Sequence, residues 1–204
     1  PCFVAYYRRY LPYFQKVRQM VEDGEIGNAQ HTDTFRPASP RFGLQQYQLP
    51  CVYNLILRGG YFYDLAPHQL DLLQDMFGCI LEAQGYKSNR GGLYPAEDTI
   101  SAASNLIPSA GIRIMVFVAH ESAKEDRIEI IGDKGMICFS VSLTIIALHT
   151  ERGREEFLPE NPPHVQLPLI KAVVEHLQGK AVCTCDGISA TPTNWVMDRI
   201  LDKL

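Results

Sequence analysis

The sequence predicts an α+β fold in which a mostly antiparallel, open β-sheet carries its helices on one face. Strand-like segments follow one another between residues 80 and 158 and are separated by turns. Helical spacing of apolar residues is confined to the segments before and after this stretch. No regular alternation of strand and helix runs along the chain, which argues against a doubly wound parallel sheet.

The composition is that of one globular domain spanning residues 1–204. Apolar residues make up 46% of the chain and charged residues 21%, so a sizeable core can be buried. The net charge of −4, with 19 scattered basic residues, argues against a nucleic-acid partner. No apolar run of about 18 residues predicts a membrane span, and the first residues lack a signal-peptide pattern. We therefore expect a soluble, cytoplasmic protein.

The cysteines and histidines indicate neither a metal site nor a disulfide framework. The six cysteines include no Cys-x-x-Cys pair, and the six histidines no His-Glu-x-x-His motif. Cys183 and Cys185 are the one close pair, and we interpret them as two small buried hydrophobes rather than a redox pair. We expect reduced thiols and no bound metal.

The elements before residue 60 are predicted from turn residues and apolar spacing. Phe3–Tyr7 is predicted as a short strand that begins almost at the first residue. A first helix begins at Pro12, follows an apolar stripe and ends before Gly24. Ala29–Arg36 alternates as a strand does, and residues 37–58 are predicted as a loop rich in proline and aromatic residues.

The remaining elements begin with a helix over residues 64–77 that ends before Gly78, and they close with two further helices. One closing helix follows Pro168 and ends before Gly179, and the other carries Trp195. Between them, short connections force antiparallel pairing. The predicted strands are Ile80–Ser88, Thr99–Ile107, Ile112–His120, Arg127–Ile131, Met136–Ser140 and Leu143–Thr150.

The sequence Asp64-Leu65-Ala66-Pro67-His68 is the best candidate for acid/base chemistry. It places a carboxylate and an imidazole four residues apart, on one face of a helix that begins here. An imidazole with an unperturbed pKa near 6.5 can give or take a proton at neutral pH. A carboxylate one turn away fixes its tautomer and favours its charged form.

A structural interpretation of the same residues is also open. Asp64, His68, Asp71 and Asp75 fall on one stripe opposite apolar residues, as in any amphipathic helix. The acidic stripe could simply face solvent, and Asp64 could be an N-cap. The spacing alone does not choose between these interpretations.

The chain contains no glycine-rich phosphate loop. No Gly-x-Gly-x-x-Gly follows any predicted strand, so this chain by itself cannot build a dinucleotide site of the usual kind. Any redox cofactor must be bound elsewhere, and we expect no dinucleotide binding by this chain alone.

Four stretches together resemble the C-terminal domain of the Gfo/Idh/MocA oxidoreductases, the glucose-fructose oxidoreductase and inositol dehydrogenase family. Their order and spacing carry the resemblance rather than any single motif. The resemblance implies a fold similar to that of dihydrodipicolinate reductase. The stretches are Tyr7–Pro12 with Gly24–Gly27, Gly59–Asp71, Glu129–Gly135, and Asn161–Gln166 running into the last two helices.

The resemblance implies a division of labour between two domains. In this family an N-terminal Rossmann domain binds NAD or NADP, and residues 1–7 then resemble the seam strand that leaves it. The family's Asp-x-x-x-His falls on Asp64 and His68, which implies His68 as the general acid/base and Asp64 as its orienting or substrate-contacting partner. Arg9 matches a family arginine, and Tyr7 and Arg36 are candidate substrate contacts.

Three functional hypotheses follow. The leading one is the substrate-binding and assembly domain of an NAD(P)-dependent oxidoreductase acting on a sugar, cyclitol or related polyol, with this chain alone inactive. The second is a non-catalytic binding or oligomerisation module in which Asp64 and His68 are inherited but idle. The third is an NAD-dependent glycoside-cleaving or epimerising relative. We expect a homo-oligomer formed through the open sheet face, because Ile112–His120 is apolar on both of its faces.

Overall fold

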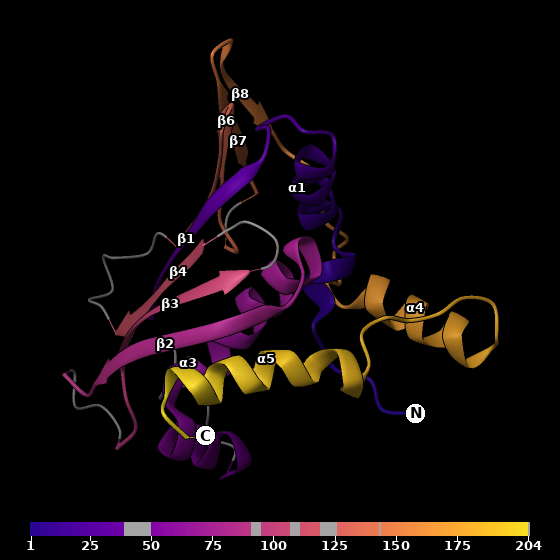
Figure 1. The fold of residues 1–204 in the computed structure, drawn as a ribbon. Coiled ribbons are helices and arrows are strands. Elements are labelled where there is room, and N and C mark those ends of the chain that lie inside the picture. Colours follow the sequence, from indigo (N-terminus) through magenta and orange to yellow (C-terminus); the bar gives the residue numbers. More distant parts are fainter. Residues whose placement is uncertain (39–49, 91–94, 107–110, 119–125, 143, 204) are drawn as a thin grey trace.

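The fold is described from a computed structural model (Figure 1). It describes residues 1–38, 50–90, 95–106, 111–118, 126–142 and 144–203. Of residues 36–38, 50–59, 61, 106 and 113–118 it describes the backbone alone. The last residues of the predicted strands Thr99–Ile107 and Ile112–His120 lie outside the described residues. The strand predicted from Leu143 begins later, at Ile146.

One open sheet of eight strands forms the centre of the described fold, in the order β2-β3-β4-β1-β5-β6-β7-β8. Apolar residues at alternate positions put one face of these strands into the core, as in β5, where Ile128 and Ile130 are buried. The strands are β1 Ala29–Ala38, β2 Ile80–Ser88, β3 Thr99–Leu106, β4 Gly111–Val118, β5 Arg127–Gly132, β6 Gly135–Phe139, β7 Ile146–Thr150 and β8 Gly153–Phe157.

Strand β1 lies at the centre of the sheet and forms the one parallel pair among the described strands, with β4. The chain between them runs through a long helix and two antiparallel strands, a connection long enough for parallel pairing. The β5–β6 hairpin closes at Asp133 and Lys134, as the glycine-flanked turn predicts. The mostly antiparallel α+β fold is therefore confirmed.

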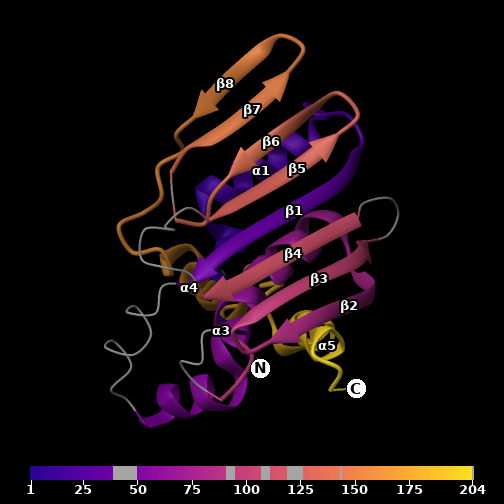
Figure 2. The same cartoon turned by 90° about the vertical axis from the view of Figure 1, so that its left-hand side faces the viewer.

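The helices gather on one face of the sheet, as predicted, and Figure 2 shows the other face free of helices. Pro12 occupies the first helical position of α1, where a missing N–H costs nothing. An N-terminal 3₁₀ turn, η1, precedes it. The bounds are η1 Tyr7–Tyr10, α1 Pro12–Glu22, α3 Pro50–Phe77, α4 Leu167–Leu177 and α5 Gly187–Ile200.

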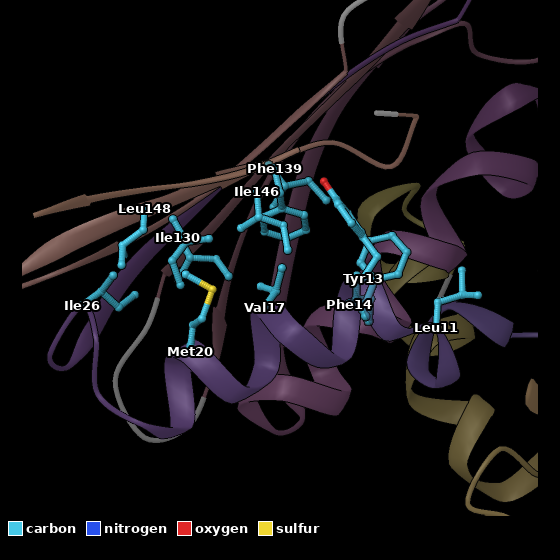
Figure 3. Packing of buried hydrophobic residues seen from close by; sticks show 13 residues of the cluster. Leu11, Tyr13, Phe14, Val17, Met20, Ile26, Ile130, Phe139, Ile146 and Leu148 are labelled. Carbon is cyan, nitrogen blue, oxygen red and sulfur yellow. The ribbon is translucent and has the colours of Figure 1, made fainter. Parts of the chain in front are cut away.

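The core between α1 and the sheet is apolar and closely packed (Figure 3). Val17 and Met20 of α1 meet Ile130 of β5 and Leu148 of β7 in this cluster. The Tyr13 ring is also buried, and its hydroxyl donates to the carbonyl of Ile145 at 2.9 Å. The ring is therefore buried while its hydroxyl group keeps a hydrogen-bond partner.

Two sequence predictions of elements are wrong, and one strand was not predicted. Phe3–Tyr7 forms one isolated bridge, between Phe3 and Asp186, and then turns into η1. Part of the predicted loop 37–58 is ordered, because β1 extends to Ala38 and α3 begins at Pro50. Strand β8 has no apolar alternation, since four of its five residues are exposed, so the sequence pattern does not reveal it.

Among the described residues, no helix is both long enough and apolar enough to cross a bilayer.

Candidate active site

Helix α3 carries the candidate catalytic residues and is broken at Gly60. Gly60 adopts φ 64° and ψ −175°, so the helix changes direction there. This backbone region is essentially restricted to glycine, because a Cβ would collide with neighbouring backbone atoms. The helical segment that bears Asp64 therefore starts at the break at Gly60, four residues before Asp64. The predicted helix start at residue 64 is wrong, and so is the alternative that Asp64 is an N-cap.

We expect Gly60→Ala to destabilise the protein by about 1–3 kcal/mol, because alanine must adopt a conformation reserved for glycine. Gly59→Ala is the matched control, since Gly59 lies in the helical part of α3 and alanine favours a helix. Urea unfolding of both variants gives the difference. Equal stabilities would contradict a glycine-dependent break.

His68 lies on α3 and contacts two aromatic rings. The rings of Tyr6 and Tyr7 both meet the imidazole edge-on, with ring centroids 5.8 Å away in each case. The residue is partly exposed, while its Nδ1 atom is shielded from solvent. Edge-to-face contacts with two rings restrict the rotation of the imidazole. The structure thus holds His68 in a defined orientation and leaves part of the residue accessible.

Tyr6 was not singled out in the sequence, although it lies as close to His68 as Tyr7 does. Burial, together with the nearby Asp71 carboxylate, raises the pKa of Tyr6 to about 12. The Tyr6 hydroxyl therefore keeps its proton at neutral pH. Only its position beside Tyr7 could have suggested a role, since the neighbourhood of His68 is created by tertiary packing.

Asp64 is exposed, one helical turn before His68. Its position on the same face agrees with the four-residue spacing. The carboxylate is accessible to a small molecule that approaches this face of α3.

Arg9 is buried and joins η1 to α3 through two carboxylates. Its Nε donates to Asp71 Oδ2 at 2.7 Å, and its Nη2 donates to Asp71 Oδ1. A further ion pair links Arg9 Nη1 to Asp75 Oδ1 at 3.4 Å, and Asp75 also accepts from Arg18 at 3.1 Å. Asp71 is only 1% exposed, so the solvent-facing interpretation of the acidic stripe is wrong at this residue.

This ion pair positions the tyrosines beside His68. Arg9 follows Tyr7 by two residues, and Asp71 follows His68 by three. Both pairs of residues therefore share a rigid turn, and the buried bond between Arg9 and Asp71 clamps the two turns together. The guanidinium of Arg9 is committed to these carboxylates.

Burial and the charge of the partner shift the pKa of each member of the Arg9–Asp71 pair in opposite directions. Burial raises the pKa of Asp71 to about 6, although the hydrogen bond and charge of Arg9 pull it down. For Arg9, burial lowers the pKa, but the bond to Asp71 and its charge overcome this and raise the pKa overall. Arg9 therefore stays charged, while Asp71 is the member of the pair that can take up a proton near pH 6.

Asp71 should make stability depend on pH. Because its folded pKa lies above the unfolded value of 3.8, the native state holds one more proton between about pH 4 and pH 6. The stability contributed by protonated Asp71 is complete below pH 4 and is lost as pH rises through 6. We expect the free energy of unfolding of the wild type, relative to Asp71→Asn, to fall by up to about 1.4 kcal/mol per pH unit in this window. Parallel urea titrations check this, and a constant difference would contradict it.

Arg36 lies in β1, where its backbone is paired with Val116 of β4. Its side chain lies outside the described residues. The structure thus brings Tyr7, His68 and the Arg9 pair together, keeps Asp64 one turn away and leaves the Arg36 side chain unplaced. Asp71, the partner that holds Arg9, could not be identified from a sequence separation of 62 residues.

Comparison with known proteins identifies the family of the domain. A family model for the GFO/IDH/MocA C-terminal domain matches residues 14–138. A curated relative, Oxidoreductase P35 from Formosa agariphila, is 28% identical over an alignment of 213 positions, and the match covers 96% of this chain and 60% of the relative. The chain thus spans 60% of the length of that relative.

Solved structures share the fold at low sequence identity. An oxidoreductase from Agrobacterium radiobacter, solved with NAD+, L-tartaric acid and magnesium, has a TM-score of 0.79 at 15% identity, over 98% of this chain and 61% of that chain. A UDP-N-acetylglucosamine 3-dehydrogenase from Acidithiobacillus ferrooxidans has a TM-score of 0.76 at 14% identity, over 98% and 60%. At these identities the structures establish the fold alone. Because the family model covers more than half of the chain, the chain belongs to the GFO/IDH/MocA C-terminal domain family.

Proposed function

We propose that the full-length protein is an NAD(P)-dependent oxidoreductase acting on a hydroxyl group of a sugar, cyclitol or related polyol. In this proposal the chain described above is the substrate-binding and assembly domain. The observation that carries the proposal is His68, held edge-on by two tyrosines and still partly exposed. The names of the relatives support it, since they include an oxidoreductase and a nucleotide-sugar dehydrogenase.

The cofactor is assigned to a part of the full-length protein outside this chain. Within the described part, no strand leads through a glycine-rich turn into a helix, and the parallel pair β1–β4 is joined through α3, β2 and β3. The residues described here therefore do not fit a dinucleotide. NAD(P), bound elsewhere, would accept the hydride from the substrate carbon.

In the proposed reaction His68 accepts the proton of the substrate hydroxyl as the carbonyl forms. Tyr6 and Tyr7 hold the imidazole in place, and Tyr7 also forms part of the wall of the substrate site. Asp64 contacts a neighbouring hydroxyl and biases His68 toward its charged form. Arg9 acts through Asp71 as a positioning residue, and Arg36 is a further proposed substrate contact.

Absorbance of reduced nicotinamide tests this function directly. Full-length protein is mixed with NAD+ or NADP+ and a panel of sugars, cyclitols and polyols, and the best substrate is then used for variants. We expect Asp64→Asn to lower kcat/KM by about 10-fold, less than removal of His68, because the amide keeps the size but not the charge. If no compound of the panel leads to reduction of the cofactor, or if kcat/KM is unchanged in Asp64→Asn, the result would favour a binding module in which Asp64 and His68 are idle.

We further propose that the helix-free face of the sheet mediates self-association. Both apolar and charged residues lie on this face, where Phe35 is exposed and Asp33 lies opposite Glu129. Short ion pairs run along the strands, such as Arg127 Nε to Glu129 Oε1 at 3.3 Å. Such a mixed face fits an interface between identical subunits. Sedimentation of the full-length protein at tens of micromolar should show a dimer or tetramer, and monomer alone would contradict this.

A further inference from the structure

A short polar stretch interrupts the apolar core between β1 and α3. Thr32 and Thr34 of β1 and Gln69 of α3 are only 0%, 3% and 1% exposed. The two threonines are two positions apart, so their side chains lie on the same face of the strand. Thr32 is paired with Ile112 on one side and with Ile130 on the other, and both isoleucines are buried in the core. Residues opposite each other in a sheet share a face, so the threonines lie on its helix-covered side.

Gln69 lies on the face of α3 that is directed at β1. One side of the helix contributes Leu73 to the apolar cluster that contains Ile112 of β4. The other side contributes Leu72 to the cluster that contains Ile130 of β5. At 100° per residue, Gln69 lies between these sides, about 40° from Leu73 and about 60° from Leu72. Because β1 lies between β4 and β5, a side chain in this direction faces β1.

Three polar atoms of this stretch have no hydrogen-bond partner among the described residues. They are Thr32 Oγ1 and the two amide atoms of Gln69, Nε2 and Oε1, and each is shielded from bulk solvent. A buried polar group without a partner is costly, and nearly all such groups in native proteins have one. Because Thr32 and Gln69 lie on facing elements, one ligand between β1 and α3 can serve both.

We propose that a water molecule bound between β1 and α3 joins Thr32 to Gln69. The hydroxyl and the amide can each donate and accept, so a ligand that also does both fits them. Buried waters make about three hydrogen bonds to groups that the protein leaves unsatisfied, which matches the three atoms here. A metal ion fits poorly, because neither side chain is charged. A polyol does not reach residues that are at most 1% exposed.

The proposed water lies close along the chain to the candidate catalytic residue. Gln69 directly follows His68 in α3. A water held by Thr32 therefore ties the turn that carries His68 to β1, the central strand of the sheet. The bond between Arg9 and Asp71 holds the next turn of the same helix from η1. The water site goes beyond the proposed function, since it requires neither a substrate nor a cofactor.

A high-resolution crystal structure of the full-length protein tests the site directly. We expect electron density for a water within hydrogen-bond distance of Thr32 Oγ1 and of the Gln69 amide. In crystals of Thr32→Val this density should be absent, because valine keeps the branched shape of threonine but has no hydroxyl. Empty space at this position in the wild type would overturn the proposal. A direct hydrogen bond between Thr32 and Gln69 would also overturn it.

Urea unfolding of the full-length protein gives an independent answer in solution. We expect Thr32→Val and Gln69→Leu each to lower the equilibrium constant for folding about 5–10-fold, because each removes one partner of the water and leaves the other residue unsatisfied. The double variant should lose less than the product of the two effects, since residues that share a water are coupled. Thr191→Val, at an exposed position of α5, is the control and should change little.

A site without water predicts the opposite result. Each single substitution would then remove an unsatisfied polar group from the core and raise the equilibrium constant for folding. Unchanged or higher stability in both single variants would therefore overturn the proposal. Neither experiment measures activity, so failure of the proposed oxidoreductase function leaves both readouts unaffected.

Discussion

His68→Ala is expected to lower kcat of the full-length protein by about 10²–10⁴-fold while leaving cofactor affinity nearly unchanged. The reason is that proton transfer contributes an acceleration of this size, whereas the nucleotide is proposed to bind outside this chain. Loss of the imidazole also removes two edge-to-face contacts, but these are worth only about 0.5–1.5 kcal/mol each, so the variant should stay folded.

His149→Ala is the matched control for this result. His149 is a partly exposed histidine on β7 and is absent from the site described here. Its replacement should leave kcat unchanged. A turnover of His68→Ala within about threefold of the wild type would remove His68 from catalysis and favour the idle-module hypothesis.

Arg9→Met is expected to lower the free energy of unfolding by about 3–5 kcal/mol at pH 8. The substitution leaves the buried Asp71 carboxylate without its guanidinium partner, and an unpaired buried charge is costly. At pH 5 the loss should be smaller, since Asp71, whose pKa is raised to about 6 by burial, can take up a proton and become neutral. Urea unfolding at the two pH values measures both effects.

Two further variants distinguish the contribution of the Arg9–Asp71 ion pair to stability from that of general packing. Arg9→Met/Asp71→Leu removes both charges and should recover most of the lost stability, because well-packed apolar residues replace a buried ion pair at little cost. Arg18→Met removes a partly exposed arginine that bonds Glu22 and Asp75, and it should cost less than about 1 kcal/mol. An equal loss in Arg9→Met and Arg18→Met would contradict the account of Arg9.

The parts of the fold with strong periodicity were predictable from the sequence. Helix α1 begins at Pro12 and ends before Gly24, and β2 spans Ile80–Ser88 as its pattern predicts. Strand β8 was not predictable, because an exposed edge strand of charged residues has no apolar alternation to reveal it. The early start of α3 was hidden by the glycines near its break, because glycine disfavours a helix interior.

The candidate site was predictable only in part. Helical spacing and the family resemblance identify Asp64 and His68, because that information is local. The clamp between Arg9 and Asp71 depends on tertiary packing, which brings together residues that neither spacing nor residue type connects. The same holds for the two tyrosine rings, since the predicted strand Phe3–Tyr7 would have pointed alternate side chains to opposite faces.

Rescue of His68→Ala by added imidazoles tests the central claim most directly, namely that this chain supplies the proton acceptor. Removal of the His68 side chain leaves a gap beside Tyr6 and Tyr7 that a small imidazole can enter. Oxidation of the best substrate by the full-length variant is then followed with imidazoles of different pKa. We expect turnover to rise with imidazole concentration and to increase with the basicity of the imidazole, as general-base catalysis requires. Rates that are the same for every imidazole, whatever its pKa, would contradict proton transfer by His68.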